Sequence, residues 1–283
     1  MWLLTGGGAI FAAFPHVYAT VFSGFYLALM LVLYALIFRA VSFEFHARVE
    51  TESARKAWSL AFGLGSALPG LLFGVALGNI IRGLPVDAEM NFTGNFFTLL
   101  NPYALLVGVL GLSMLATHGA IWLLIKAEGE LREKATSWAK SAWTAFFVLF
   151  MVASIVTILW LPERLANFKS APMLWIIPIA TMVFLILLRS AIAGARYGSA
   201  FFFSALSIVS MWALTGASIF PALVPARGNP ELSLTIMNAS SSQLTLQVML
   251  ILAIIGMPFV IGYTIWIYSK FRGPISSYGE GAY

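Results

Sequence analysis

The chain has 283 residues, of which 60% are hydrophobic and only 10% are charged. A soluble globular domain carries about 25% charged residues, and the mean hydropathy of +0.92 is correspondingly high. The composition excludes a soluble enzyme and a disordered segment, and the absence of cysteine excludes disulfides and thiol chemistry. The net charge of +5 predicts no nucleic-acid partner, because the few basic residues lie beside apolar segments. We therefore expect an integral membrane protein.

The first apolar segment, Trp2 to Phe14, is too short to span a membrane. At about 1.5 Å per residue it reaches roughly 20 Å; Pro15 interrupts it, and the run Gly6 to Gly8 weakens any helix. A signal peptide is the alternative, but no basic region precedes it. We expect a short, partly buried segment on the outer face. Nothing polar precedes Trp2, so we also expect that the beginning is cut short.

Seven further segments have the roughly 20 apolar residues that a membrane-spanning helix needs. They lie at about 17–41, 57–80, 103–126, 138–160, 172–192, 199–221 and 245–268. Every Asp and Glu falls between or beyond them, and they are too long and too continuously apolar for barrel strands. The sequence predicts an all-α, polytopic bundle of seven full transmembrane helices preceded by the short apolar segment.

The basic residues are divided unevenly between the two ends of these spans. One end has only four, Arg82, Arg164, Lys169 and Arg227, whereas the other end has twelve. Because cytoplasmic loops carry the excess of Lys and Arg, we expect the C-terminal tail to be cytoplasmic. The long loops 81–102 and 222–244 are then external, and the aromatic and leucine side chains of the first could pack on the bundle.

Histidine would be the ligand of a haem in such a bundle, but the three histidines are poorly placed for one. His46 lies in a charged loop, His16 lies at the edge of a span, and His118 lies about 12 Å from the nearer end of its helix. His16 and His118 are at different depths and cannot clamp one haem. A single axial histidine is an alternative; we favour a buried polar group at His118. The histidines also argue against a metal site, since no intramembrane carboxylate accompanies them.

Ion-coupled carriers and pumps place charged residues inside the membrane, and the central part of every span lacks them. His118 is the titratable candidate there, apart from tyrosines. It is the residue that we single out for a proton path. A polytopic secondary transporter stays the alternative function, although no charged partner accompanies the prolines that could break its helices.

Gly70, Gly74 and Gly78 form a ridge of small residues on one helix face. Such ridges allow the backbones of neighbouring helices to approach closely. The partner helix could belong to the same bundle or to another chain.

Four stretches, in the same order along the chain, resemble subunit II of the cytochrome bd-type quinol oxidases. They are WLLTGGGAIFAAFPHVYATVFSGFYLA at 2–28, FGVALGNIIRGLPV at 73–86, FTGNFFTLLNPYALL at 92–106 and SSSQLTLQVM at 240–249. The resemblance implies a bacterial inner-membrane complex that oxidises quinol and reduces oxygen, coupled to the proton-motive force. It implies that subunit I carries haems b and d, and that this chain holds no haem and no catalytic residue.

The resemblance also implies a membrane-lipid environment, with a bound quinone or lipid and a small accessory subunit as further components. Family members begin with one more span, followed by a polar stretch that ends in Gly-Asn-Gln-Val-Trp, and Met1 here stands in the place of that valine. We therefore expect one integral-membrane domain, 1–283. It would comprise the three-span remnant of a first four-helix bundle at about 1–126 and a second four-helix bundle at about 136–271.

Overall fold

The computed structural model describes residues 2–271, and the side chains from Leu4 onward. Seven helices of this part are long and apolar enough to cross a membrane, as expected. These long helices are α3 (Tyr26–Arg48), α4 (Glu52–Arg82), α6 (Pro102–Lys126), α7 (Gly129–Trp160), α9 (Ile176–Ala193, preceded by the turn η2, Pro172–Trp175), α10 (Tyr197–Ile219) and α11 (Gln243–Lys270).

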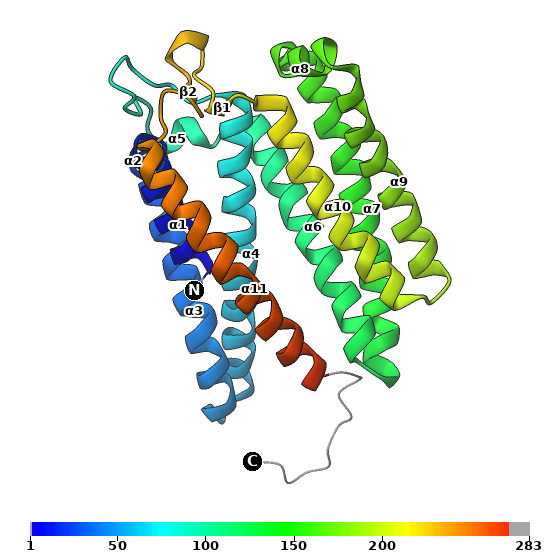
Figure 1. Cartoon of the computed structure of the whole chain (residues 1–283). Helices are drawn as coiled ribbons and strands as arrows, with labels where there is room; N and C mark the ends of the chain where they lie inside the picture. Colours follow the sequence, from blue (N-terminus) through cyan, green and yellow to red (C-terminus); the bar gives the residue numbers. More distant parts are fainter. Residues whose placement is uncertain (1, 272–283) are drawn as a thin grey trace.

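The short elements gather mainly at one end of the bundle (Figure 1). They are α1 (Trp2–Ala13), α2 (Pro15–Gly24), α5 (Phe96–Leu99), η1 (Pro162–Leu165), α8 (Ala166–Ser170), β1 (Ala222–Val224), η3 (Pro230–Leu232) and β2 (Leu234–Thr235). We call this end the loop end; the opposite end, which has most of the basic residues, is the basic end.

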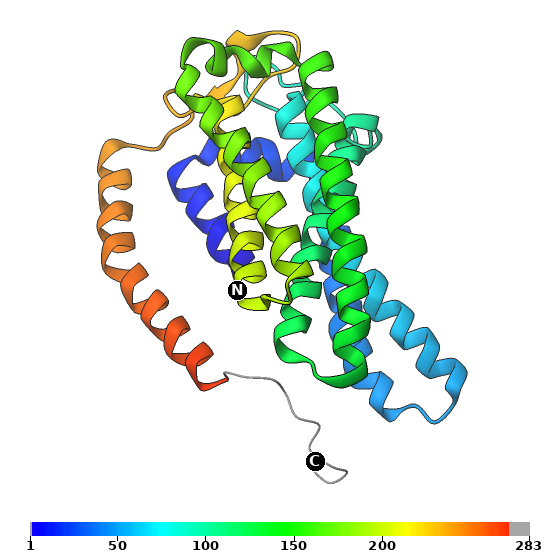
Figure 2. The same cartoon turned by 90° about the vertical axis from the view of Figure 1, so that its right-hand side faces the viewer.

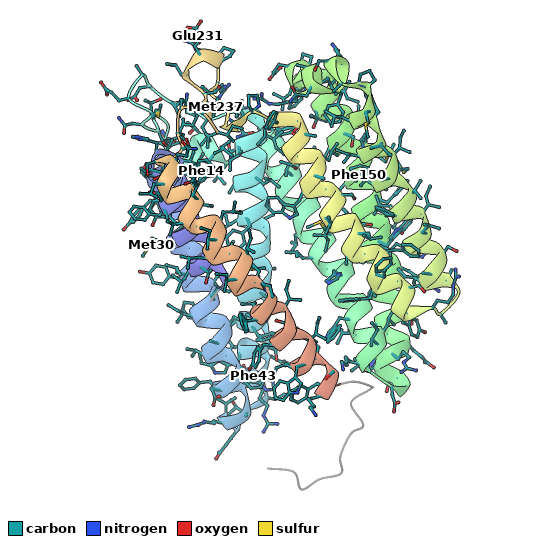
Figure 3. All side chains as sticks on the ribbon, in the orientation of Figure 1. Phe14, Met30, Phe43, Phe150, Glu231 and Met237 are labelled. Atoms are coloured by element: carbon teal, nitrogen blue, oxygen red, sulfur yellow. The ribbon has the colours of Figure 1, made fainter. Side chains whose placement is uncertain are left out.

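The long helices form a row rather than a closed ring. Helix α4 packs between α3 and α6, α6 packs on α7, and the pair α9 and α10 closes against α6 and α7. Phe146 and Phe150 pack between these last helices, together with Leu110 and Leu185. Phe150 is labelled in Figure 3. Helix α6 therefore joins the two halves of the molecule.

Helix α11 stands apart from the other helices (Figure 2). None of its described side chains is buried. It contacts α1 near the loop end, and at the basic end the rings of Trp122 and Tyr268 meet edge to face at 6.1 Å. The expected division into two bundles at about 1–126 and 136–271 stays a prediction, since α6 links both groups and α11 leans on α1.

The predicted first span, 17–41, is wrong in its boundaries. The chain turns at Phe25, so α2 ends there and the spanning helix is α3. Phe25 is buried among loop-end residues that include Leu84, Leu99 and Leu234. At Gly24, a Cβ would lie 2.8 Å from the Phe92 ring, so the loop 81–102 presses directly on this turn. Hydropathy could not reveal the turn because the residues on both sides of it are equally apolar.

The first segment also differs from its prediction. It forms the regular helix α1 through the glycine run and ends just before Pro15. Instead of lying on the outer face, α1 descends from α2 to about mid-height of the bundle (Figure 1). Its burial is limited: Leu4 is 81% exposed and Phe11 is 59% exposed. In a lipid environment these apolar side chains need no protein neighbours.

The loops 81–102 and 222–244 pack on each other at the loop end. The Leu84 amide donates to the Pro225 carbonyl at 2.9 Å, and the Arg227 amide donates to the Leu84 carbonyl at 2.8 Å. β1 and β2 form an antiparallel hairpin beside this contact. The predicted packing of the first loop is confirmed for Leu99, which is buried, but Phe97 is 79% exposed.

Asn79 fastens the first loop to the bundle. Its Nδ2 donates to the Leu99 carbonyl at 2.8 Å and to the Val75 carbonyl at 2.9 Å. Its Oδ1 accepts from Asn101 Nδ2 at 2.8 Å, while Asn101 Oδ1 caps α6 by accepting from the Ala104 amide at 3.0 Å. Asn79 is buried, so these bonds satisfy a polar side chain that would otherwise be costly in the membrane.

We expect Asn79→Ala to lower the free energy of unfolding by about 1–3 kcal/mol, because it removes the short hydrogen bonds that Asn79 makes with the Leu99 carbonyl and the Asn101 side chain. The measurement is the thermal unfolding of the purified protein in detergent. Asn91→Ala is the matched control, since Asn91 is exposed in the same loop. Equal destabilisation by both substitutions would show that Asn79 does not fasten the loop.

Candidate functional site

The three ridge glycines lie on the face of α4 that packs against α6. A Cβ at Gly74 would lie 2.8 Å from both the Gly108 Cα and the Val107 carbonyl oxygen. A Cβ at Gly78 would lie 2.8 Å from the Ala104 Cα. At Gly70 the nearest atom is in the flexible Leu115 side chain, at 3.1 Å. Of the three ridge glycines, Gly74 and Gly78 thus approach the backbone of α6 most closely.

Helix α6 presents a matching set of small residues. A Cβ at Gly108 would lie 2.6 Å from Val75 Cγ2 and 3.1 Å from the Leu71 carbonyl oxygen. Ala104 and Gly108 are four residues apart, so both lie on the same face of α6. This second small-xxx-small pattern could have been found in the sequence but was missed. We call the contact of Gly74 and Gly78 with Ala104 and Gly108 the α4–α6 seam.

Within this chain the ridge meets α6, and a role of the ridge as an interface with another chain stays a prediction. Gly70, Gly74 and Gly78 are all buried within the chain. Two helices whose backbones approach this closely gain van der Waals contact along their length, which drives helix association in membranes.

His118 lies on another side of α6, against α10. Its Nδ1 is 2.9 Å from the Ser204 hydroxyl, and its ring lies 4.6 Å from the Phe201 ring. The side chain is half-buried, and it connects two spans through a polar contact; its assignment as a buried polar group stays a prediction. A role for His118 in a proton path stays a prediction. Ser204, its partner, was not identified from the sequence.

The other two histidines lie at opposite ends of the bundle. His16 is exposed near the start of α2 at the loop end, and His46 is exposed near the end of α3 at the basic end. Within residues 2–271, no three His, Asp or Glu side chains come together in a way that could hold a metal ion. The three histidines do not face one another, so they do not fit a haem held between two of them.

Comparison with known proteins shows the family of the chain. The family model for cytochrome bd terminal oxidase subunit II matches residues 1–271. The chain belongs to the cytochrome bd oxidase subunit II family. A probable cytochrome oxidase subunit 2 of Haemophilus influenzae is 39% identical, over 98% of this chain and 81% of the relative. The cytochrome bd-I ubiquinol oxidase subunit 2 of Escherichia coli K12 is 35% identical over the same shares.

A solved structure, the bd oxidase from Geobacillus thermodenitrificans, shares the fold. Its TM-score is 0.68 at 17% identity, covering 86% of this chain and 72% of the other. The family assignment confirms the resemblance of the four sequence stretches, and it disfavours the transporter alternative. This subunit II is a multi-pass bacterial membrane protein that belongs to a quinol oxidase complex.

We expect Gly74→Leu to destabilise the chain by at least about 2 kcal/mol, because the added side chain would force the α4–α6 seam apart. Gly63→Leu is the control: it lies on the same helix, and nothing is within 4 Å of its Cβ position. The readouts are thermal unfolding in detergent and the yield of the assembled complex on native gels. If both variants unfold at the same temperature, the seam does not stabilise the protein.

Proposed function

We propose that this chain is the non-catalytic, haem-free subunit of a quinol:oxygen oxidoreductase, and that it stabilises the haem-bearing subunit I. The complex would act in aerobic respiration and couple its reaction to the proton-motive force. The observation that carries the haem-free assignment is the geometry of the histidines. His118 lies within α6 beside Ser204, whereas His16 and His46 lie at opposite ends of the bundle, so no two histidines face each other across one haem.

Haems b and d are then expected in subunit I. They would supply electron transfer and oxygen reduction, and this chain would contribute helix packing. Its described part has apolar surface to offer: on α11, Leu252 is 65% exposed, Ile254 is 63% exposed and Phe259 is 75% exposed. Such a surface suits membrane lipid, subunit I, a small accessory subunit or the tail of a bound quinone.

The chain purified alone should show no haem absorbance and no quinol oxidase activity, because its histidines supply no ligand pair. Coexpression with subunit I should yield a complex that has both. His118→Ala in that complex is the control and should keep the haem spectrum. Stoichiometric haem in the isolated chain would contradict the proposal, and a haem-bearing subunit I that accumulates equally well without this chain would contradict the stabilising role.

We also propose that the basic end faces the cytoplasm, which places the C-terminus there. The argument is the excess of Lys and Arg at that end. A green fluorescent protein fused to the C-terminus should be fluorescent, and alkaline phosphatase inserted in the loop 222–244 should be active. A non-fluorescent C-terminal fusion together with an inactive loop insertion would show that the basic end faces away from the cytoplasm.

A further inference from the structure

The loop end contains a pocket of about 420 Å³ whose lining is rich in arginine. Arg82, Arg164 and Arg227 all line it, from three segments far apart in the sequence: the end of α4, the turn η1 and the loop after β1. We call it the arginine pocket. Within residues 2–271, only four Lys and Arg residues lie at the loop end. Three of these four residues line one pocket, so the basic residues of the loop end are clustered.

The last turn of α4 and the residues after it bind Arg164 and Arg227 through backbone groups. Arg164 Nε donates to the Ile81 carbonyl at 2.6 Å, and one of its terminal nitrogens is 3.5 Å from the Arg82 carbonyl. Gly83 follows with a φ of 97°, a conformation that favours glycine. It lets the chain turn so that the Leu84 carbonyl accepts from the Arg227 amide at 2.8 Å.

The charges in the pocket do not balance. Among the described residues that line it, Glu163 is the carboxylate facing three guanidinium groups. Glu163 reaches Arg164 only at 4.0 Å, and its own side chain is 55% exposed. The charges of Arg82 and Arg227 repel each other. Glu231 does not compensate them, since it lies at the far tip of the loops (Figure 3).

Arg164 is the most enclosed of these groups, with a side chain only 13% exposed. Burial lowers its pKa, while Glu163 and Tyr103 act in the opposite direction. A buried cation without a close counter-ion is costly. An anion in the pocket would remove this cost, and the planar guanidinium is well suited to bind phosphate through two parallel hydrogen bonds.

An apolar pocket lies directly beside the arginine pocket, on the membrane side. It has a volume of about 160 Å³, and Tyr103 and Arg164 line both pockets. Its other walls include Phe150, Trp175 and Met211, from α7, η2 and α10. At the boundary, the Tyr103 and Thr157 hydroxyls are 2.8 Å apart. A basic pocket next to an apolar pocket suits an amphiphilic ligand whose anionic head group lies in the first and whose apolar part lies in the second.

We propose that the arginine pocket binds a phosphate group, that of an anionic phospholipid whose acyl chain enters the adjoining apolar pocket. Guanidinium groups of Arg82, Arg164 and Arg227 contact the phosphate oxygens. The lipid neutralises the excess charge and links α4, η1 and the loop after β1. The phosphate contacts do not depend on the proposed oxidase function, because they come from three arginines at the loop end of this chain.

The test uses the purified complex that contains this chain, reconstituted in phosphatidylcholine nanodiscs with or without phosphatidylglycerol. Native mass spectrometry and thermal unfolding report binding. We expect phosphatidylglycerol to be retained and to raise the unfolding temperature. The double variant Arg82→Gln with Arg227→Gln should weaken this binding roughly tenfold or more, since each charged hydrogen bond contributes appreciably. Arg164 is left unchanged, because it also holds the backbone.

Lys169→Gln is the matched control, since Lys169 is the fourth basic residue of this end and lies outside both pockets. It should bind phosphatidylglycerol like the original protein. Inorganic phosphate, added to nanodiscs of pure phosphatidylcholine, tests whether the anion comes from a lipid or from solution. If it raises the unfolding temperature as much as phosphatidylglycerol does, and the double variant loses this effect, the pocket binds soluble phosphate and the lipid assignment is overturned. If neither probe binds, or if the double variant and Lys169→Gln bind alike, the proposal is overturned.

Discussion

The close approach of α4 and α6 is the contact on which the rest of the structure depends. In a membrane, apolar surface gains nothing from leaving lipid for protein, so helices associate through close packing and through polar contacts. Gly74 and Gly78 meet Ala104 and Gly108 without intervening side chains. Helix α3 then packs on the other side of α4, and α7 and α10 pack on α6. Loss of the seam would therefore separate the two halves of the molecule.

Hydrogen bonds between polar groups hold the packed helices and loops at defined positions. Asn79 ties the loop 81–102 to the loop end of the seam, and His118 ties α6 to α10 through Ser204. Trp143 does the same for α7 and α9, with its indole nitrogen donating to the Leu185 carbonyl at 2.9 Å. Each group bridges segments distant in sequence. Together they fix the register of helices whose apolar surfaces alone would allow sliding.

The two ends of the bundle are chemically different, and the difference suits different partners. The basic end spreads most of its charges over exposed positions, with helix-internal pairs such as Lys56 with Glu52 at 2.7 Å, while the partly buried Arg189 stacks on the Trp143 ring. The loop end has few charges, but three of its arginines converge on one pocket. Surface pairs contribute little to stability, whereas Arg164 is enclosed and its carboxylate neighbour Glu163 lies 4.0 Å away. The loop end is therefore the end at which we propose that an anion binds.

The sequence by itself determined the membrane class, the number of spans, the small-residue ridge on α4 and the family. These follow from composition, from runs of about 20 apolar residues and from motifs read in one dimension. The seam was half visible in the sequence: Gly74 marked one side, while Gly108 was overlooked although its spacing from Ala104 carries the same signal. The intramembrane location of His118 was visible as well, but its partner Ser204 was not.

Only the tertiary structure decided where apolar segments turn and which distant residues meet. The turn at Phe25 follows from its burial among Leu84, Leu99 and Leu234, and the descent of α1 follows from its place beside α2 and α11. The arginine pocket joins positions 82, 164 and 227. Hydropathy is a property of each segment alone, whereas these features arise from contacts between segments. That is why no local pattern in the sequence could have revealed them.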